Sequence, residues 1–400
     1  MELMRNRIRP YAWGSRTAIA ELTGAPCPSA HPQAELWMGA HPDDPSVLVG
    51  TAGDVSLLDA VVADPDGMLG EAVAGKFDGR FPFLLKVLAA AEPLSLQAHP
   101  SAELARRGFD AEEAAGIARS DPSRNYTDPW AKPELICALT EFHALCGFAD
   151  PAHAVDVLRG LDVAGLDHYL ALLAGQRDAE GTRALFSTLI TIPPNAMSSL
   201  LDAVLAACVA RVREGVSPHV TQYRTALELA ERYPGDAGVL ASLMLNRVTL
   251  QPGQALYLHS GNLHAYLSGT GIEIMGNSDN VLRGGLTPKH VDVPELMRVL
   301  DFTPGPVEIL GGQAAPQGEV VYPSPAPEFR LSRLQLDERP HEVTHPGPQV
   351  LLVTEGDAVV EAADGGRLAV PRGQSVWIAA RDRGVTVSGP ATVFRATDGL

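Results

Sequence analysis

The stretch of residues 253–290 constrains the fold most, because it combines strand-like sequence, closely spaced glycines and side chains suited to chemistry. His264 follows Gly261 by three residues within its strand-like first third. The run SDNVLRGGLTPKH then places Arg283 and Lys289 on either side of tightly packed glycines. Glycine permits close approach of the backbone to a ligand, and arginine with lysine suits an anionic group. The stretch therefore predicts strands and tight turns around an anion site.

The spacing of Gly253, His259, Gly261 and His264 resembles the second half of the cupin signature. This resemblance implies a small β-barrel with His264 pointing inward, where a neutral imidazole can coordinate a divalent metal. His259 stands where that signature usually has proline, so we expect it at the rim of the site rather than among the ligands.

The same intervals recur near the C-terminus, at Gly365, Pro371, Gly373 and Val376. Alternating strand patterns flank both copies. Val376 occupies the position of His264, so two barrels are predicted and only the first of them can hold a metal in this way.

Strand and helix patterns divide the chain into four parts. Helical spacing dominates from Pro151 to about Pro234, and strand patterns return near Val248 and continue to the C-terminus. We predict a mainly β fold of two cupin (jelly-roll) barrels with an all-helical insertion. The catalytic metal-binding barrel is expected at 1–100, 129–150 and 240–310, with a helical excursion at 101–128. The helical domain is expected at 151–236, and the metal-free barrel at 311–400.

Composition excludes several classes of protein. The chain has 400 residues, 46% of them hydrophobic, and a net charge of −17, which argues against a nucleic-acid or anionic-lipid partner. Its four cysteines form no CxxC pair or disulfide framework, and no segment suggests a membrane span. We therefore expect a soluble cytoplasmic protein.

Three motifs carry a more specific resemblance. HAYLSGTGIEIMGNSDNVLRGGLTPKH at 264–290, LSLQAHP at 94–100 and KPE at 132–134 are similar, in this order, to the signatures of type I phosphomannose isomerases. The resemblance implies interconversion of mannose 6-phosphate and fructose 6-phosphate through a cis-enediol. It also implies a sugar phosphate as the only partner, a monomer, and a product used for GDP-mannose or glycolysis.

Gln97 and His99 are two residues apart on a predicted strand and therefore face the same side. Together with Glu134 and His264 they would give a mixed set of nitrogen and oxygen ligands, suited to Zn²⁺ and compatible with Mn²⁺, Fe²⁺ or Co²⁺. From composition alone, a strand histidine followed by proline, as His99 is, is more often a structural residue than a metal ligand. The family resemblance places the metal ligands at these four positions.

Arg283, nineteen residues after His264, stands in the position of the family's catalytic arginine. The proton transfer between C1 and C2 needs a base, for which Glu273 and Lys132 are both candidates. The resemblance places Lys86, Ser95, Tyr266, Lys289 and Trp13 in the substrate cleft. Of these, Lys86, Ser95 and Lys289 are expected to bind the phosphate. The remaining histidines are expected at the surface, and Trp37 is expected to pack in the core.

Other functions stay open at this point. Two histidines and a carboxylate could serve an iron-dependent oxygenase, although Gln97 and the Arg/Lys cluster argue against it. A non-catalytic sugar-binding cupin would not need Arg283. An isomerase of a related sugar phosphate is compatible with all three motifs.

Overall fold

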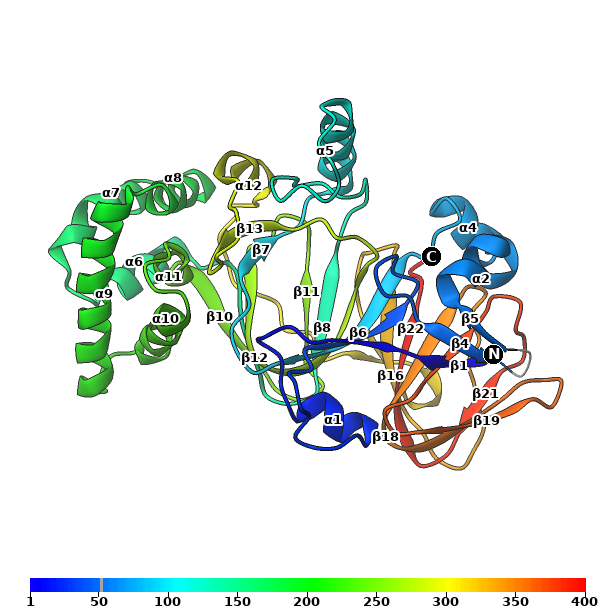
Figure 1. The fold of residues 1–400 in the computed structure, drawn as a ribbon. Helices are drawn as coiled ribbons and strands as arrows, with labels where there is room; N and C mark the ends of the chain where they lie inside the picture. The colour runs from blue at the N-terminus through cyan, green and yellow to red at the C-terminus, as the bar shows by residue number, and fades with distance from the viewer. Residues whose placement is uncertain (51–52) are drawn as a thin grey trace.

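The computed structural model of the protein describes residues 1–50 and 53–400, and contains two antiparallel sheets and a lateral group of helices (Figure 1). Helices take up about as many residues as strands. The prediction of a mainly β chain is therefore wrong in its proportions. The predicted helical insertion is present, and further helices at residues 57–76 add to it.

The first sheet is ten-stranded and is built around β12, which pairs with β6, β7, β8 and β9. Strand β6 is buried along its whole length, although Lys86 lies in its middle. A charged residue in a buried strand needs charged partners, which the site supplies. The strands are β2 (Arg7–Arg9), β3 (Glu35–Gly39), β6 (Phe83–Ala90), β7 (Leu96–Ala98), β8 (Glu134–Ala138), β9 (Phe142–Phe148), β10 (Leu245–Leu250), β11 (Ala255–Leu258), β12 (His264–Gly276) and β13 (Leu282–Gly285).

The second sheet is twelve-stranded and contains both ends of the chain. Strand β1 pairs with β20, and β4 and β5 extend the sheet from β1, so these N-terminal strands lie outside the unit in which residues 1–100 were expected. The strands are β1 (Glu2–Arg5), β4 (Val47–Gly50), β5 (Gly53–Ser56), β14 (Gln313–Ala314), β15 (Glu319–Tyr322), β16 (Arg330–Gln335), β17 (His341–Glu342), β18 (Gln349–Glu361), β19 (Arg367–Pro371), β20 (Ser375–Ile378), β21 (Thr386–Ser388) and β22 (Ala391–Thr397).

The repeated spacing in the sequence corresponds to a repeated backbone conformation. Gly253 and Gly261 have φ values of +85° and +83°, and Gly365 and Gly373 have +89° and +82°. A Cβ would lie 2.7 Å from a backbone carbonyl oxygen at Gly261 and 2.4 Å from one at Gly373. Glycine is required at both turns because no other residue combines this φ with such close packing.

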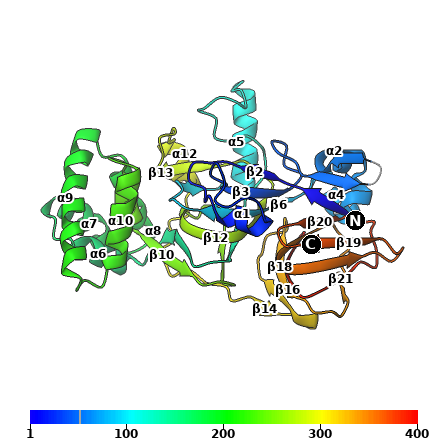
Figure 2. The ribbon, with the colours of Figure 1, turned by 60° about the horizontal axis from the view of Figure 1, so that its bottom comes forward.

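The helical insertion lies at one end of the first sheet (Figures 1 and 2). Asp150 begins it by accepting the N–H groups of Ala152 and His153, with Pro151 in the first turn. Its helices are α6 (Pro151–Arg159), α7 (Asp167–Gly175), α8 (Ala179–Ile190), α9 (Pro194–Glu214), α10 (Val220–Arg232) and α11 (Gly238–Ser242), with a 3₁₀ turn at Ala164–Leu166.

Helix α9 bears on the expectation that no segment of the chain suggests a membrane span. By length and composition alone it is apolar enough to cross a membrane, and no such segment was expected. Five of its side chains nevertheless pack into the helical core between α9 and its neighbours, namely Met197, Leu200, Leu201, Val204 and Cys208.

Shorter helices surround the sheets, and α5 projects from the first sheet in both views (Figures 1 and 2). The Ser101 hydroxyl caps α5 by accepting the N–H of Leu104, as its sequence position predicts. The remaining helices are α1 (Ala18–Thr23), α2 (Leu57–Ala63), α3 (Pro65–Leu69), α4 (Glu71–Lys76), α5 (Ala102–Ala114), α12 (Val293–Val299) and a 3₁₀ turn at Pro316–Gly318.

Candidate metal centre and substrate cavity

His99, Glu134 and His264 converge from three strand ends of the first sheet. His99 follows β7, Glu134 begins β8 and His264 begins β12. The two Nε2 atoms lie 3.2 Å and 3.3 Å from the two carboxylate oxygens of Glu134, and each of these residues is at most 2% exposed. The long-range pairing of β12 with β7 and β8 therefore brings together residues that are far apart in sequence.

Both imidazoles are held in the same tautomer by backbone carbonyls. Nδ1 of His99 lies 2.7 Å from the Asn280 carbonyl oxygen, and Nδ1 of His264 lies 3.0 Å from that of Asn262. Because a carbonyl only accepts, Nδ1 carries the proton in each ring and Nε2 presents a lone pair. Such carbonyl contacts are typical of histidines that bind metals.

The donor set fits a divalent metal. Within residues 1–50 and 53–400, neither Nε2 has a hydrogen-bond partner, and neither has Glu134 Oε2, although all three atoms are buried. Two lone pairs facing a carboxylate are unfavourable unless a cation neutralises them. Although burial raises it, the pKa of Glu134 lies well below its usual range, and the nearby ammonium group of Lys132 contributes to this lowering. These three side chains, with an oxygen of Gln97, could hold such a cation.

A cavity of about 600 Å³ opens over this cluster. Gln97 lies on its wall, half-buried and paired in register with His264. The predicted site residues that line it are Trp13, Lys86, Ser95, Gln97, Lys132, Glu134, Tyr266, Glu273, Arg283 and Lys289. The structure therefore brings all twelve predicted site residues to one place, with His99 and His264 buried next to Glu134.

One wall of the cavity is a row of buried charges on β3, β6 and β12. The ammonium group of Lys86 lies 3.2 Å from Glu273 Oε2 and 3.5 Å from Glu35 Oε1. Burial lowers the pKa of Lys86, but Glu35, Glu273 and Glu134 outweigh it and raise the pKa. Burial raises the pKa of Glu273, although the positive charge of Lys86 acts to lower it. Lys86 therefore stays charged between carboxylates, while Glu273 is more basic than an ordinary glutamate.

Arg283 and Lys289 differ from Lys86 because no carboxylate neutralises them. Burial lowers the pKa of Arg283, and Arg283 in turn lowers that of Lys289. Among the described residues neither side chain has an ion-pair partner. Two adjacent cations without a carboxylate in a cavity wall favour binding of an anion.

Three further predicted residues complete the lining. Tyr266 is 1% exposed, and its hydroxyl has no hydrogen-bond partner in the part of the chain that the structure describes. Burial raises its pKa well above the usual range, so the phenol stays protonated. The ring of Trp13 stacks on Tyr11, and Ser95 is half-buried before β7. Tyr266 thus offers a free hydrogen-bond donor to a ligand.

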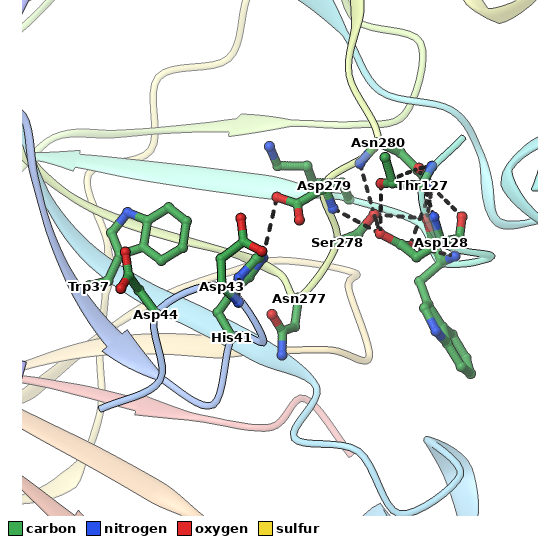
Figure 3. Close-up of polar contacts among 12 residues, drawn as sticks. Trp37, His41, Asp43, Asp44, Thr127, Asp128, Asn277, Ser278, Asp279 and Asn280 are labelled. Carbon is green, nitrogen blue, oxygen red and sulfur yellow. Dashed lines mark hydrogen bonds and ion pairs between the residues drawn. The ribbon is translucent and has the colours of Figure 1, made fainter. Parts of the chain in front are cut away.

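The sequence reading missed His41, which was expected at the surface with the other histidines. His41 is 2% exposed, lines the cavity, and places Nε2 3.3 Å from Asp279 Oδ1 (Figure 3). Its Nδ1 accepts the backbone N–H of Asp43. Trp37 is buried as predicted, but it also lines the cavity and donates to Glu35. The sequence GAHPDD gives no periodic signal that would identify His41.

A hydrogen-bond network fixes the loop that leads to Lys132 and Glu134 (Figure 3). The Asn280 amide donates to the Asp128 and Trp130 carbonyls and accepts the N–H of Thr127. Asp128 in turn accepts the N–H of Asp279. Since the Asn280 carbonyl also orients His99, one residue links the metal-ligand cluster to the loop.

His259 does not belong to the cluster. Its side chain is exposed, its Nδ1 contacts the Ser260 carbonyl, and it lines a different cavity. The group of three buried side chains that could hold a metal does not include it. The expectation that His259 lies at the rim of this site is wrong, because the side chain lines another cavity.

Comparison with known proteins agrees with this geometry. A model of the catalytic domain of phosphomannose isomerase type I matches residues 1–150. Mannose-6-phosphate isomerase of Escherichia coli (strain K12) is 40% identical, with 100% of both chains covered. The enzyme of Rattus norvegicus is 31% identical, with 97% of this chain and 96% of that protein covered.

Solved structures give the same result. A variant of phosphomannose isomerase from Salmonella typhimurium superposes with a TM-score of 0.92 at 37% identity, covering 100% of both chains. A mannose 6-phosphate isomerase bound with zinc and yttrium superposes with a TM-score of 0.90 at 38% identity, again over 100% of both chains. Similarity of this extent in sequence and structure shows that the chain belongs to the type I phosphomannose isomerases.

Proposed function

We propose that the protein interconverts D-mannose 6-phosphate and D-fructose 6-phosphate through a cis-enediol. The observation that carries this proposal is the juxtaposition in one cavity of the His99–Glu134–His264 cluster with Arg283 and Lys289. The cluster suits a metal near the sugar oxygens, and the two cations suit the phosphate. The full-length relatives named mannose-6-phosphate isomerase support the same substrate.

Zn²⁺ is the proposed cofactor, held by Gln97, His99, Glu134 and His264. Two neutral imidazoles and two oxygen ligands suit zinc, and a relative of known structure binds it. When bound, the ion would act as a Lewis acid that stabilises negative charge on the oxygens of C1 and C2.

The phosphate-binding group consists of Arg283 and Lys289, with Ser95 and Trp13 as further contacts to the sugar phosphate. An arginine fork matches phosphate oxygens in two places, whereas lysine acts as a point charge. Arg283 has a second role, as the fixed positive charge that stabilises the transition state. Its register opposite Gln97 places its backbone beside a proposed ligand.

Two groups are suited to move the proton between C1 and C2. Glu273 is buried with a raised pKa, and Lys132 lies 3.4 Å from Glu134 Oε1. Lys86 would hold Glu273 in place, and the Tyr266 hydroxyl would donate to a sugar oxygen. Burial of these groups keeps water away from the reacting carbons, which protects the cis-enediol.

We extend the proposal to the architecture and the cellular context. The repeated glycine turns support a jelly-roll barrel for each sheet. The catalytic unit would comprise 129–150, 240–310 and residues 1–100 except strands β1, β4 and β5, which pair with the second sheet. The helical parts would lie at 101–128 and 151–236, and the metal-free unit would combine 311–400 with those three strands. The acidic chain would act as a cytoplasmic monomer on a small-molecule substrate.

A coupled assay tests the proposal. Activity on mannose 6-phosphate is measured before chelation, after chelation and after restoring Zn²⁺. We expect activity to disappear and return. A metal-loaded protein that turns over another sugar phosphate but not mannose 6-phosphate would contradict the substrate assignment and leave the metal site intact.

The choice of base is tested by Lys132→Met and Glu273→Gln. The variant that lacks the base should stop the exchange of the C2 proton with solvent, while substrate binding is retained. If both variants still exchange the C2 proton with solvent, neither residue is the base.

A further inference from the structure

The second sheet encloses a cavity of its own, which the isomerase reaction does not use. Its volume is about 300 Å³, at the lower end of the range for small-molecule sites. Its walls come from β15, β16, β17, β22 and the loop after β17. The lining residues are Pro316, Glu319, Arg330, Ser332, His341, Glu342, Thr344, His345, Arg395 and Thr397.

Strand register places this cavity on the same face of the sheet as Val376, the counterpart of the metal ligand His264. Ser332 pairs with Arg395, Arg395 with Leu351, and Leu351 with Val376. Directly paired residues share a face of a sheet, so these four side chains form one row. The face that carries a metal ligand in the first sheet therefore carries an arginine in the second.

Along the strands, this face changes from apolar to polar. The row of Leu334, Val393 and Val353 is buried in a hydrophobic cluster. The next row on this face, two residues further along β22, contains Arg395. The row after that contains Thr397. An interior surface that ends in polar groups suits a polar occupant, either water or a ligand.

Arg395 is the buried cation of this cavity, at 7% exposure. Its Nε donates to Gln349 Oε1 at 2.8 Å, and its Nη2 donates to the Thr344 carbonyl at 3.0 Å. Its Nη1 reaches Glu319 Oε1 only at 3.4 Å. A guanidinium carries five N–H donors, so two remain for a ligand. Burial lowers its pKa without removing the charge.

Arg330 supplies a second cation at the rim. Within the described chain its guanidinium makes no hydrogen bond or ion pair, and its charge contributes to lowering the pKa of Arg395. The carboxylate of Glu319 accepts the Ser332 hydroxyl and pairs with Arg395, and His345 pairs with Asp398. Glu342, the other carboxylate of the lining, is exposed, so solvent screens its charge.

We propose that this cavity of the second sheet is a binding site for a small phosphate-sized oxyanion, held between Arg395 and Arg330. Both arginines can present paired N–H donors, which match tetrahedral oxyanions better than single charges do. The site lies on a different sheet from the proposed catalytic cavity and shares no lining residue with it.

Inorganic phosphate is the probe. Binding to the zinc-loaded, full-length protein is measured by isothermal titration calorimetry. We expect two sites per chain, one in each cavity. Arg330→Ala should weaken phosphate binding in the cavity of the second sheet by about tenfold to a hundredfold, because a charged hydrogen-bond donor is lost. Lys289→Ala should weaken phosphate binding in the cavity of the first sheet. The matched control is Arg367→Ala, which removes another exposed arginine from β19 and should retain both sites.

Two further measurements separate this site from the isomerase reaction and from misfolding. Arg330→Ala should keep the wild-type kcat and KM on mannose 6-phosphate and the wild-type Tm. Arg330→Lys, which keeps the charge, should recover part of the phosphate affinity. A single phosphate site in the wild-type protein, or equal phosphate binding by Arg330→Ala and Arg367→Ala, would overturn the proposal, whatever the isomerase assay shows.

Discussion

The two glycine turns, at residues 253–264 and 365–376, have the same backbone conformation but opposite chemistry. Their glycines have φ values between +82° and +89° in both copies. Position 264 is a histidine that faces a carboxylate, whereas position 376 is a valine at 0% exposure in an apolar cluster. The comparison teaches that the turn provides a geometry, and that the side chain at its end decides whether the surrounding interior suits a metal or forms an apolar core.

The side chains around these two positions differ in the same way, charged around His264 and apolar around Val376. Around His264, buried charges occur in balanced sets, such as Lys86 between Glu35 and Glu273. Around Val376, the neighbours are Leu351 and Ile378, and polar side chains return only towards the cavity at Arg395. Buried charges are stable only with partners, so a catalytic interior needs many coordinated substitutions and an apolar interior needs few.

The strongest test makes the first turn resemble the second. His264→Val should lower kcat on mannose 6-phosphate by roughly a thousandfold or more, because several kcal/mol of charge stabilisation are lost with the metal. Metal content per chain should fall in parallel. The reciprocal Val376→His should gain neither metal nor activity. Stoichiometric zinc binding by Val376→His would contradict the conclusion that the second interior lacks the partners of a metal site.

A second test compares the arginines of the two cavities. Arg283→Ala should reduce kcat/KM by about a hundredfold to a thousandfold, the effect of removing one preorganised donor to a developing charge. Arg330→Ala, a loss of the same side chain from the second cavity, should leave kcat/KM unchanged. Steady-state kinetics on both variants gives the answer, and equal losses would mean that the second cavity takes part in the reaction.

A third test concerns the apolar interior. Val376→Thr keeps the volume but buries a hydroxyl, and should lower the free energy of unfolding by about 1–3 kcal/mol. Urea titration measures this change. The control Val55→Thr, at 48% exposure, should change it by less than about 0.5 kcal/mol. Similar values for both variants would mean that position 376 is not part of a tightly packed core.

The smallest effect is expected at the mouth of the first cavity. Although burial raises it, the pKa of Asp279 is lowered overall by His41. A carboxyl with a depressed folded pKa stabilises the protein above its unfolded pKa and loses this contribution as pH falls through the folded value. Because the side chain is 48% exposed, Asp279→Asn should cost at most about 1 kcal/mol near pH 7.

Urea titrations of wild type and Asp279→Asn at neutral and acidic pH measure this contribution. The difference between the two proteins should shrink as the pH falls below the carboxyl range. A difference that grows on acidification would contradict the sign of the pKa shift.

Much of the local structure was predictable from the sequence. Ser101 begins a helix where its position indicates, and the apolar spacing of the insertion produced helices. Strand β18 is harder to predict, because the sequence shows two separate strand patterns, at 349–354 and at 358–362. The structure has one strand that continues through Gly356, with a register shift between Val353 and Glu355. A break in a sequence pattern can therefore lie within one continuous strand, here close to a bulge at Thr354.

The location of β1, β4 and β5 was not predictable. These short strands complete the second sheet by pairing Leu3 with Val376, a contact between the two ends of the chain. His41 was missed for a similar reason, because its partner Asp279 is distant in sequence. Local patterns report burial and periodicity, and they do not report which distant segment supplies the partner.

The sequence by itself determined the family resemblance, the spacing of the turns and the identities of the candidate ligands, because these depend on residue type and local order. Tertiary structure alone decided which nitrogen of His99 and His264 faces Glu134, because backbone carbonyls from Asn280 and Asn262 hold the opposite nitrogen. It also decided that Lys86 is neutralised while Arg283 and Lys289 are not. Electrostatic environment is set by distances between strands that only long-range pairing establishes.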